Sequence, residues 1–168
     1  MAAEALARGD EYRWNDGLYR KAGRNPDDIP WADMVPNPHM VAWLDGRCKA
    51  NGAKALVVAC GLGDDAEELA RCGYDVTAFD VSPAAIEWCR ERFPGSPVKH
   101  EVVDLFRAPA EWRTAFNLVV EIHTLQVLTG KLRPVAMEEL AGFVAPGGAL
   151  LVISRGRDRG EPEGEFPW

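Results

Sequence analysis

Long apolar runs are missing from the 168 residues of this chain. A helix that crosses a membrane needs about 20 consecutive, mostly apolar residues, and no stretch approaches that length. The first residues, MAAEALARGDEYRW, contain acids and lack the apolar centre of a signal peptide. These absences predict a soluble, cytoplasmic protein with no membrane partner.

An excess of positive charge is missing as well. The chain has 26 Asp and Glu residues against 19 Lys and Arg residues, which gives a formal net charge of −7 at pH 7. A surface that binds a nucleic-acid backbone or an anionic membrane is normally basic. The charge therefore argues against a nucleic-acid partner and favours a small-molecule ligand.

Cysteines are few and lack metal-binding spacing. The four residues Cys48, Cys60, Cys72 and Cys89 form no CxxC motif and are too sparse for a secreted disulfide scaffold. The sequence therefore predicts reduced thiols and no metal site.

What the chain does contain is an alternation of strand-like and helix-like segments. Apolar, β-branched runs predict strands at residues 55–60, 75–80, 98–104, 116–123 and 148–154, and helical patterns occupy residues 3–22, 38–49, 64–73, 82–93 and 131–144. This alternation implies an α/β fold, a Rossmann-like doubly wound parallel sheet. The length suits a single domain, with N-terminal helices and a loop in residues 1–52, the core in 53–157 and a flexible tail in 158–168.

The first predicted strand leads directly into two glycines, in the stretch LVVACGLGDDAEELA at residues 56–70. Gly61 and Gly63 precede a helix, whose first N–H groups and dipole attract polar or anionic groups of a ligand. With Ala66 they fit the G-x-G-x-x-G/A pattern, and Asp80 ends the next strand, where a carboxylate binds ribose hydroxyls. The pattern predicts a ribose-containing cofactor, although glycine also serves a plain strand–turn–helix connection.

Two other strands also end in ionisable residues. Asp104 ends the third strand, and Glu121 lies near the carboxyl end of the fourth, beside His123. In a parallel sheet these ends share one edge, where open α/β folds bind ligands. A carboxylate in an apolar strand is costly to bury without a partner, so Glu121 is a candidate functional residue. His123 is either its catalytic neighbour or only a hydrogen-bonded residue of the rim.

In these segments and their order, the chain resembles the class I S-adenosylmethionine-dependent methyltransferases. VVACGLGDDA is similar to their glycine motif, VTAFDVSPAAIEWC to their ribose-binding strand and next helix, and VVDLF to their adenine-edge segment. FNLVVEIHTLQVL is similar to their fourth strand, and ELAGFVAPGGALLVISRG to their last helix, Pro-Gly-Gly turn and fifth strand. IPWADMVPNPHMVAWL and CGLGDDA most resemble the branch that methylates thiopurines, thiols and halides.

The resemblance implies S-adenosylmethionine as cofactor, S-adenosylhomocysteine as product, a small-molecule methyl acceptor and the strand order 3-2-1-4-5. For an acceptor that must lose a proton, Glu121 and His123 are the candidate catalytic bases. The other implied contacts are Ala59, Cys60, Gly61 and Gly63 at the methionine moiety, Asp80 at the ribose, Val81, Asp104 and Leu105 at the adenine, and Trp31 in an N-terminal segment that covers the cofactor. Trp31 would otherwise only plug the underside of the domain.

Two features depart from the pattern of that class. Many members have an acid near the end of the first strand, where this chain has Val57. The cofactor's ammonium group would then need Asp64, Asp65 or Glu121. The sequence also ends before the helix and two antiparallel strands that complete the sheet in the class. We therefore expect the fifth strand to be an edge, covered either by further sequence of a longer protein or by a second copy in a homodimer.

Two other functions stay open from the residues alone. A nicotinamide-dependent oxidoreductase would explain the glycines and Asp80 but not the acids of the third and fourth strands, and the chain has no Tyr-x-x-x-Lys pair. A non-catalytic module that only binds the cofactor would use the same residues as an enzyme. The acceptor, whether a thiol, a halide or another small nucleophile, has no signature in the sequence.

Overall fold

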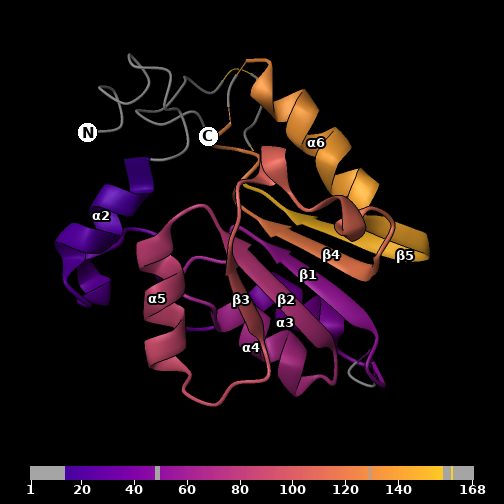
Figure 1. The fold of residues 1–168 in the computed structure, drawn as a ribbon, viewed down its shortest axis with the longest axis horizontal. Coiled ribbons are helices and arrows are strands. Elements are labelled where there is room, and N and C mark those ends of the chain that lie inside the picture. The colour runs from indigo at the N-terminus through magenta and orange to yellow at the C-terminus, as the bar shows by residue number, and fades with distance from the viewer. Residues whose placement is uncertain (1–13, 48–49, 129, 157–159, 161–168) are drawn as a thin grey trace.

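Five parallel strands form one sheet in the order β3-β2-β1-β4-β5 (Figure 1). The structure, a computed structural model, describes residues 14–47, 50–128, 130–156 and 160. The strands are β1 (Lys54–Val58), β2 (Asp75–Asp80), β3 (Lys99–Val102), β4 (Phe116–Ile122) and β5 (Val144–Ile153). The predicted α/β class and strand order are confirmed.

Helices connect the strands and form the outer layers. They are α2 (Trp14–Ala22), α3 (Pro38–Leu44), α4 (Asp64–Arg71), α5 (Pro83–Arg92) and α6 (Leu132–Phe143), with 3₁₀ turns η1 (Pro26–Asp28), η2 (Leu105–Arg107) and η3 (Ala110–Trp112). Asn37 and Ser82 cap α3 and α5, and each is followed by proline at the first helical position. A cap residue followed by proline is a strong start signal, so these two helices begin where the sequence predicts.

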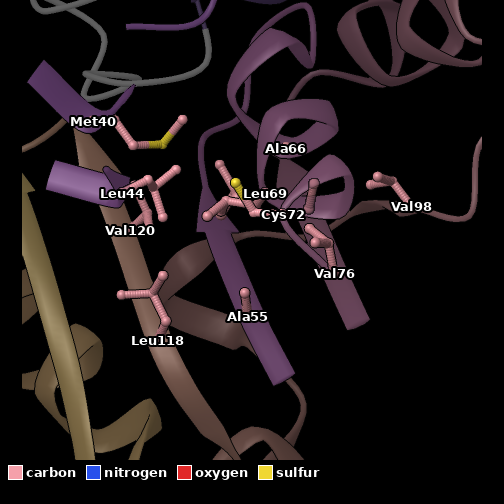
Figure 2. Packing of buried hydrophobic residues seen from close by; sticks show 12 residues of the cluster. Met40, Leu44, Ala55, Ala66, Leu69, Cys72, Val76, Val98, Leu118 and Val120 are labelled. Carbon is pink, nitrogen blue, oxygen red and sulfur yellow. The ribbon is translucent and has the colours of Figure 1, made fainter. Parts of the chain in front are cut away.

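One hydrophobic cluster fills the space between the sheet and helices α3 and α4. Met40 and Leu44 of α3 pack toward Leu118 and Val120 of β4, and Leu69 of α4 lies beside the end of β1 (Figure 2). All five side chains are at most 2% exposed. Their burial removes apolar surface from water and holds the two helices against this face.

The second hydrophobic cluster lies on the opposite face of the sheet. Leu140 and Phe143 of α6 pack there with Leu56 of β1 and Val119 of β4. Because both faces of the central strands are covered, β1 and β4 consist of nearly continuous apolar runs. Polar groups are concentrated where these strands end.

The N-terminal helix α2 packs against α5 rather than against the sheet (Figure 1). Tyr19 of α2 and Trp88 of α5 belong to a third, smaller hydrophobic cluster. At the start of α5, Asp16 accepts hydrogen bonds from the Ser82 hydroxyl at 2.8 Å and the Ala84 N–H at 3.2 Å. This contact brings α2 to the end of β2, next to the predicted site.

Three details differ from the sequence prediction or lie outside the description. β5 begins at Val144 instead of residue 148, because Phe116 pairs with Val144 and, after a register shift, Leu118 pairs with Ala149. Cys72 is disulfide-bonded, so the prediction of reduced thiols is wrong for it, whereas Cys60 and Cys89 are free. Cys48, residues 3–13 of the first predicted helix and the predicted tail, except Gly160, lie outside the described residues.

Within the residues that the structure describes, no helix is both long enough and apolar enough to cross a membrane.

Candidate functional site

The carboxyl ends of three neighbouring strands bring the predicted site residues together. Val58, the last residue of β1, pairs with Phe79 on one side and with Glu121 on the other. The glycine loop therefore emerges between Asp80 at the end of β2 and Glu121 near the end of β4. This arrangement is the shared edge that the sequence predicts.

The loop after β1 has a left-handed backbone at three of its five residues, 59–63. The φ angles are 49° at Ala59, 54° at Gly61 and 91° at Gly63. A Cβ on Gly63 would lie 3.1 Å from Cys89 Sγ and 3.3 Å from His100 Nε2. Glycine at 63 is therefore required both by its conformation and by the close packing of the loop on α5 and β3. Gly63 has no side chain with which to cap α4, so residue 63 leaves the N–H groups of the first turn without a side-chain cap.

Asp80 is the buried last residue of β2, and its carboxylate faces the glycine loop. One oxygen accepts the Gly61 N–H at 3.1 Å, and the other accepts the Ser82 N–H at 2.9 Å. Burial raises the pKa of Asp80 to about 6, although the backbone N–H groups of Ser82, Gly61 and Val81 partly oppose that rise. A carboxylate oxygen can accept more than one hydrogen bond, so Asp80 retains capacity for ligand hydroxyls.

Glu121 is fully buried, and only one of its two oxygens has partners. Its Oε1 accepts the N–H groups of Thr124 and Leu125, which folds the segment after β4 over the strand end. Its Oε2 is buried and has no hydrogen-bond partner. Burial raises the pKa of Glu121, with the two N–H groups and the His123 ring acting in the opposite direction. A buried oxygen without a partner is costly, and a cationic or hydrogen-bond-donating ligand group would remove that cost.

His123 follows β4 in a left-handed conformation, with φ at 64°. Its backbone N–H donates to the Ile153 carbonyl at 2.8 Å, and its ring Nδ1 lies 3.1 Å from Gln126 Oε1. These contacts fix the ring at the rim next to Glu121. They account for His123 as a hydrogen-bonded rim residue, and His123 acts against the rise in the pKa of both Glu121 and Asp65.

Asp65, in the first turn of α4, also belongs to this edge. It accepts the Asn37 N–H at 2.7 Å and so ties the segment before α3 to the glycine loop. Burial raises its pKa to about 6. The sequence offered Asp65 only as one of three partners for an ammonium group, and the contact with Asn37 has no local sequence signal.

The residues predicted for the adenine side lie beyond β2 and β3. Asp104 is past the end of β3, which stops at Val102, and caps η2 by accepting the Phe106 N–H at 3.0 Å. Leu105 is buried, and Val81, directly after Asp80, is half-buried. The structure therefore brings these three residues to the same edge as the glycine loop but assigns Asp104 to a turn rather than to the strand.

The N-terminal segment adds one residue that the sequence did not single out. Trp31 donates its indole N–H to the Tyr19 hydroxyl at 2.8 Å, and the two rings meet edge to face at 6.0 Å. Tyr19 is only 1% exposed, whereas Trp31 is 42% exposed. The Tyr19 hydroxyl lies 3.4 Å from the position of a Cβ on Gly61. The Tyr19 hydroxyl therefore lies against the glycine loop at Gly61.

Cys60 and Cys89 complete the surroundings of the loop. The Cys89 thiol donates to the Gly61 carbonyl at 3.1 Å. The neighbouring Cys89 thiol and burial raise the pKa of the Cys60 thiol. Within the residues that the structure describes, no group of three or more His, Cys, Asp or Glu side chains is arranged to hold a metal ion.

The family model of the methyltransferase domain matches residues 55–148 of this chain. The matched range runs from β1 into β5 and includes the glycine loop, Asp80 and Glu121. The match covers more than half of the chain.

The relatives that match this chain are also named as methyltransferases. The chain is 31% identical over 127 residues to an uncharacterized methyltransferase of Mycobacterium tuberculosis, covering 76% of this chain and 61% of the relative. It is 32% identical to a ubiquinone biosynthesis O-methyltransferase of Thiobacillus denitrificans, covering 73% and 53%, and 24% identical to a probable thiol methyltransferase of Arabidopsis thaliana, covering 91% and 64%. The chain thus spans between about half and two thirds of the length of these relatives.

Solved structures share the fold. One, from a study of the conversion of a disulfide bond into a thioacetal group during echinomycin biosynthesis, has a TM-score of 0.70 and 29% identity, covering 83% of this chain and 59% of that one. The N-methyltransferase NodS of Bradyrhizobium japonicum, solved with S-adenosylhomocysteine, has a TM-score of 0.61 and 23% identity, covering 81% and 70%.

Proposed function

Because the chain belongs to the methyltransferase-domain family, we propose that it binds S-adenosylmethionine at the carboxyl ends of its strands and transfers the methyl group to a small-molecule nucleophile. The observation that carries the proposal is the buried pair of carboxylates on either side of the glycine loop. Asp80 keeps accepting capacity, and Glu121 Oε2 has no partner. The cofactor would supply two ribose hydroxyls and an ammonium group, which are the donors that these carboxylates lack.

The chain's own residues would bind the cofactor in a defined order along the edge. Asp80 would accept the ribose hydroxyls, and Val81, Asp104 and Leu105 would border the adenine. The backbone from Ala59 through Cys60 and Gly61 to Gly63 would face the methionine moiety. Glu121 would accept the ammonium group, in place of the acid that this chain lacks at Val57. The raised pKa of Glu121 would then fall on binding, since a nearby positive charge favours the carboxylate.

The methyl group on a sulfonium is already an activated electrophile. The chain then has to align the acceptor with it and exclude water. A thiolate or halide acceptor needs no base, and the likeness to a thiol methyltransferase supports this class. An oxygen acceptor, which the likeness to a ubiquinone biosynthesis O-methyltransferase supports, must lose a proton. His123, which Gln126 holds at the rim, would take it.

Trp31 would cover the bound cofactor as part of an N-terminal lid. Its indole is anchored to Tyr19, beside the glycine loop, and more than a third of its surface is exposed. Binding would bury more of that surface, as lids do when they close over a ligand.

The test is a titration of the protein with S-adenosylhomocysteine and, separately, with NAD. We expect calorimetry to detect binding of S-adenosylhomocysteine and none of NAD, and we expect tryptophan fluorescence to change with the former. Trp31→Phe should remove most of that change, whereas Trp43→Phe, on α3, should not. Binding of NAD without a response to S-adenosylhomocysteine would favour the oxidoreductase alternative. Binding of S-adenosylhomocysteine without turnover of any thiol, halide or phenol would favour a non-catalytic binding module.

A further inference from the structure

The Tyr19 hydroxyl is a buried hydrogen-bond donor that the structure leaves unused. The oxygen accepts the Trp31 indole N–H, but among the described residues no group accepts the hydroxyl's own proton. The side chain is 1% exposed, so water does not readily take that role. A buried donor without an acceptor is costly, and an accepting group of a ligand at the glycine loop would remove that cost.

The position of the hydroxyl is fixed from three sides. Asp16 holds α2 to the start of α5 through Ser82 and Ala84. The Tyr19 ring packs edge to face on Trp88 at 6.5 Å and on Trp31 at 6.0 Å. The hydroxyl is thereby directed at Gly61, 3.4 Å from where a Cβ would stand.

The surroundings of the hydroxyl keep it protonated. Burial, followed by the charge of Asp80, raises the pKa of Tyr19 well above its ordinary range. The carboxylate of Asp80 accepts the N–H groups of Gly61 and Ser82 and not the Tyr19 hydroxyl. The hydroxyl therefore keeps its proton and can donate it to an accepting group.

The arginines of the elements around the loop are engaged elsewhere. Arg92 pairs with Asp64 at 2.7 Å and donates to the Leu62 carbonyl. Arg24 pairs with Glu91 and Glu87. An anionic ligand group at Gly61 thus meets a neutral donor rather than either of these guanidinium groups.

We propose that Tyr19 binds the carboxylate of the cofactor's amino-acid moiety through its hydroxyl. The inference rests on the proposed function, in which the glycine loop faces this moiety. Tyr19 and Glu121 then divide the recognition of the zwitterion, because Tyr19 donates to the carboxylate and Glu121 Oε2 accepts from the ammonium group. Tyr19 also links this recognition to Trp31, whose N–H bonds the same hydroxyl.

The experiment is a cycle of two proteins and two ligands. The parent and Tyr19→Phe are titrated by calorimetry with S-adenosylhomocysteine and with its decarboxylated analogue, S-adenosyl-3-thiopropylamine, which keeps the ammonium group. We expect the parent to prefer S-adenosylhomocysteine, and we expect this preference to fall about tenfold in Tyr19→Phe, as for the loss of a hydrogen bond to a charged group. Tyr74 lies just before β2, at the end of the strands opposite to the candidate site. Tyr74→Phe should keep the parent's preference.

Each result has one meaning. Equal weakening of both ligands by Tyr19→Phe would overturn the proposal, because it indicates a structural role. An unchanged preference would overturn it as well. If circular dichroism shows that Tyr19→Phe is unfolded, the parent alone decides: equal affinity for the two ligands overturns the proposal, and a preference for S-adenosylhomocysteine supports it. A parent that binds neither ligand overturns the proposed function too, which separates that failure from one confined to Tyr19.

Discussion

Ala59 has the least suitable side chain for its backbone conformation in the glycine loop. Its φ of 49° lies in the left-handed region, where a Cβ collides with the following carbonyl oxygen at a cost of about 1–2 kcal/mol. Glycine avoids this collision but loses more freedom on folding, by about 0.4–1 kcal/mol. We therefore expect Ala59→Gly to raise the free energy of unfolding by about 0.5–1 kcal/mol, measured by urea denaturation.

A matched control lies in the preceding strand. Ala55 of β1 is fully buried and forms part of a regular ladder, so glycine there gains no relief and loses packing. Ala55→Gly should lower the free energy of unfolding. If Ala59→Gly lowers it to the same extent, the left-handed conformation costs less than this argument requires.

The sequence predicted the positions of those residues whose place follows from chain order. Gly61, Asp80 and Glu121 each stand at the end of an apolar run, and parallel strands place such ends on one edge. Tyr19 was missed for a physical reason. Its contact with Gly61 depends on how α2 packs against α5, and the pattern within α2 carries no information about that packing.

A hydrogen bond to a titratable carboxyl group links α4 to the segment before α3. Asp65 accepts the Asn37 N–H, and burial raises its pKa from the ordinary 3.8 to about 6. Between these two values the folded protein binds a proton that the unfolded chain has released. The stabilisation from Asp65 is therefore complete below about pH 4 and is lost as the pH rises through 6.

Asp65→Asn keeps an oxygen for the Asn37 N–H but does not titrate. We expect the stability of the variant relative to the parent to grow by about 1–3 kcal/mol between pH 4 and pH 7.5, measured by denaturation at each pH. Burial lowers the pKa of His100, so its contribution is lost as the pH falls, which is the opposite direction. His100 is present in both proteins and cancels in the difference. A difference that does not change with pH would mean that Asp65 is ionised in the folded protein throughout.

The first and last residues of the helices and strands were harder to predict than the presence of these elements. The Asn37-Pro38 and Ser82-Pro83 pairs mark helix starts because cap and proline act locally. The start of β5 was misplaced, because pairing with Phe116 extends it back to Val144 across a register shift. That extension depends on a partner strand, and Pro-Gly-Gly by itself indicates a turn.

At the scale of the whole molecule, the candidate site residues lie at one end of the strands because three parts of the fold meet there. The strands end at this edge, α4 begins there, and α2 reaches it from outside the sheet through α5. The opposite ends of the strands contribute none of the predicted site residues. Substitutions at the opposite ends of the strands, such as Tyr74→Phe, therefore serve as controls that leave the site residues unchanged.

The outer edge of β5 is the feature of the whole molecule that calls for a partner. In the described part of the chain β5 pairs only with β4, and Leu150 and Val152 are 37% and 43% exposed. An open edge with apolar side chains is a template for pairing with another chain. We predict that two copies associate through β5, so sedimentation at high micromolar concentration should show a dimer. Val152→Lys should shift it to monomer, because charge blocks edge pairing, whereas Val102→Lys at the β3 edge should not. A parent that stays monomeric at every concentration would contradict the pairing.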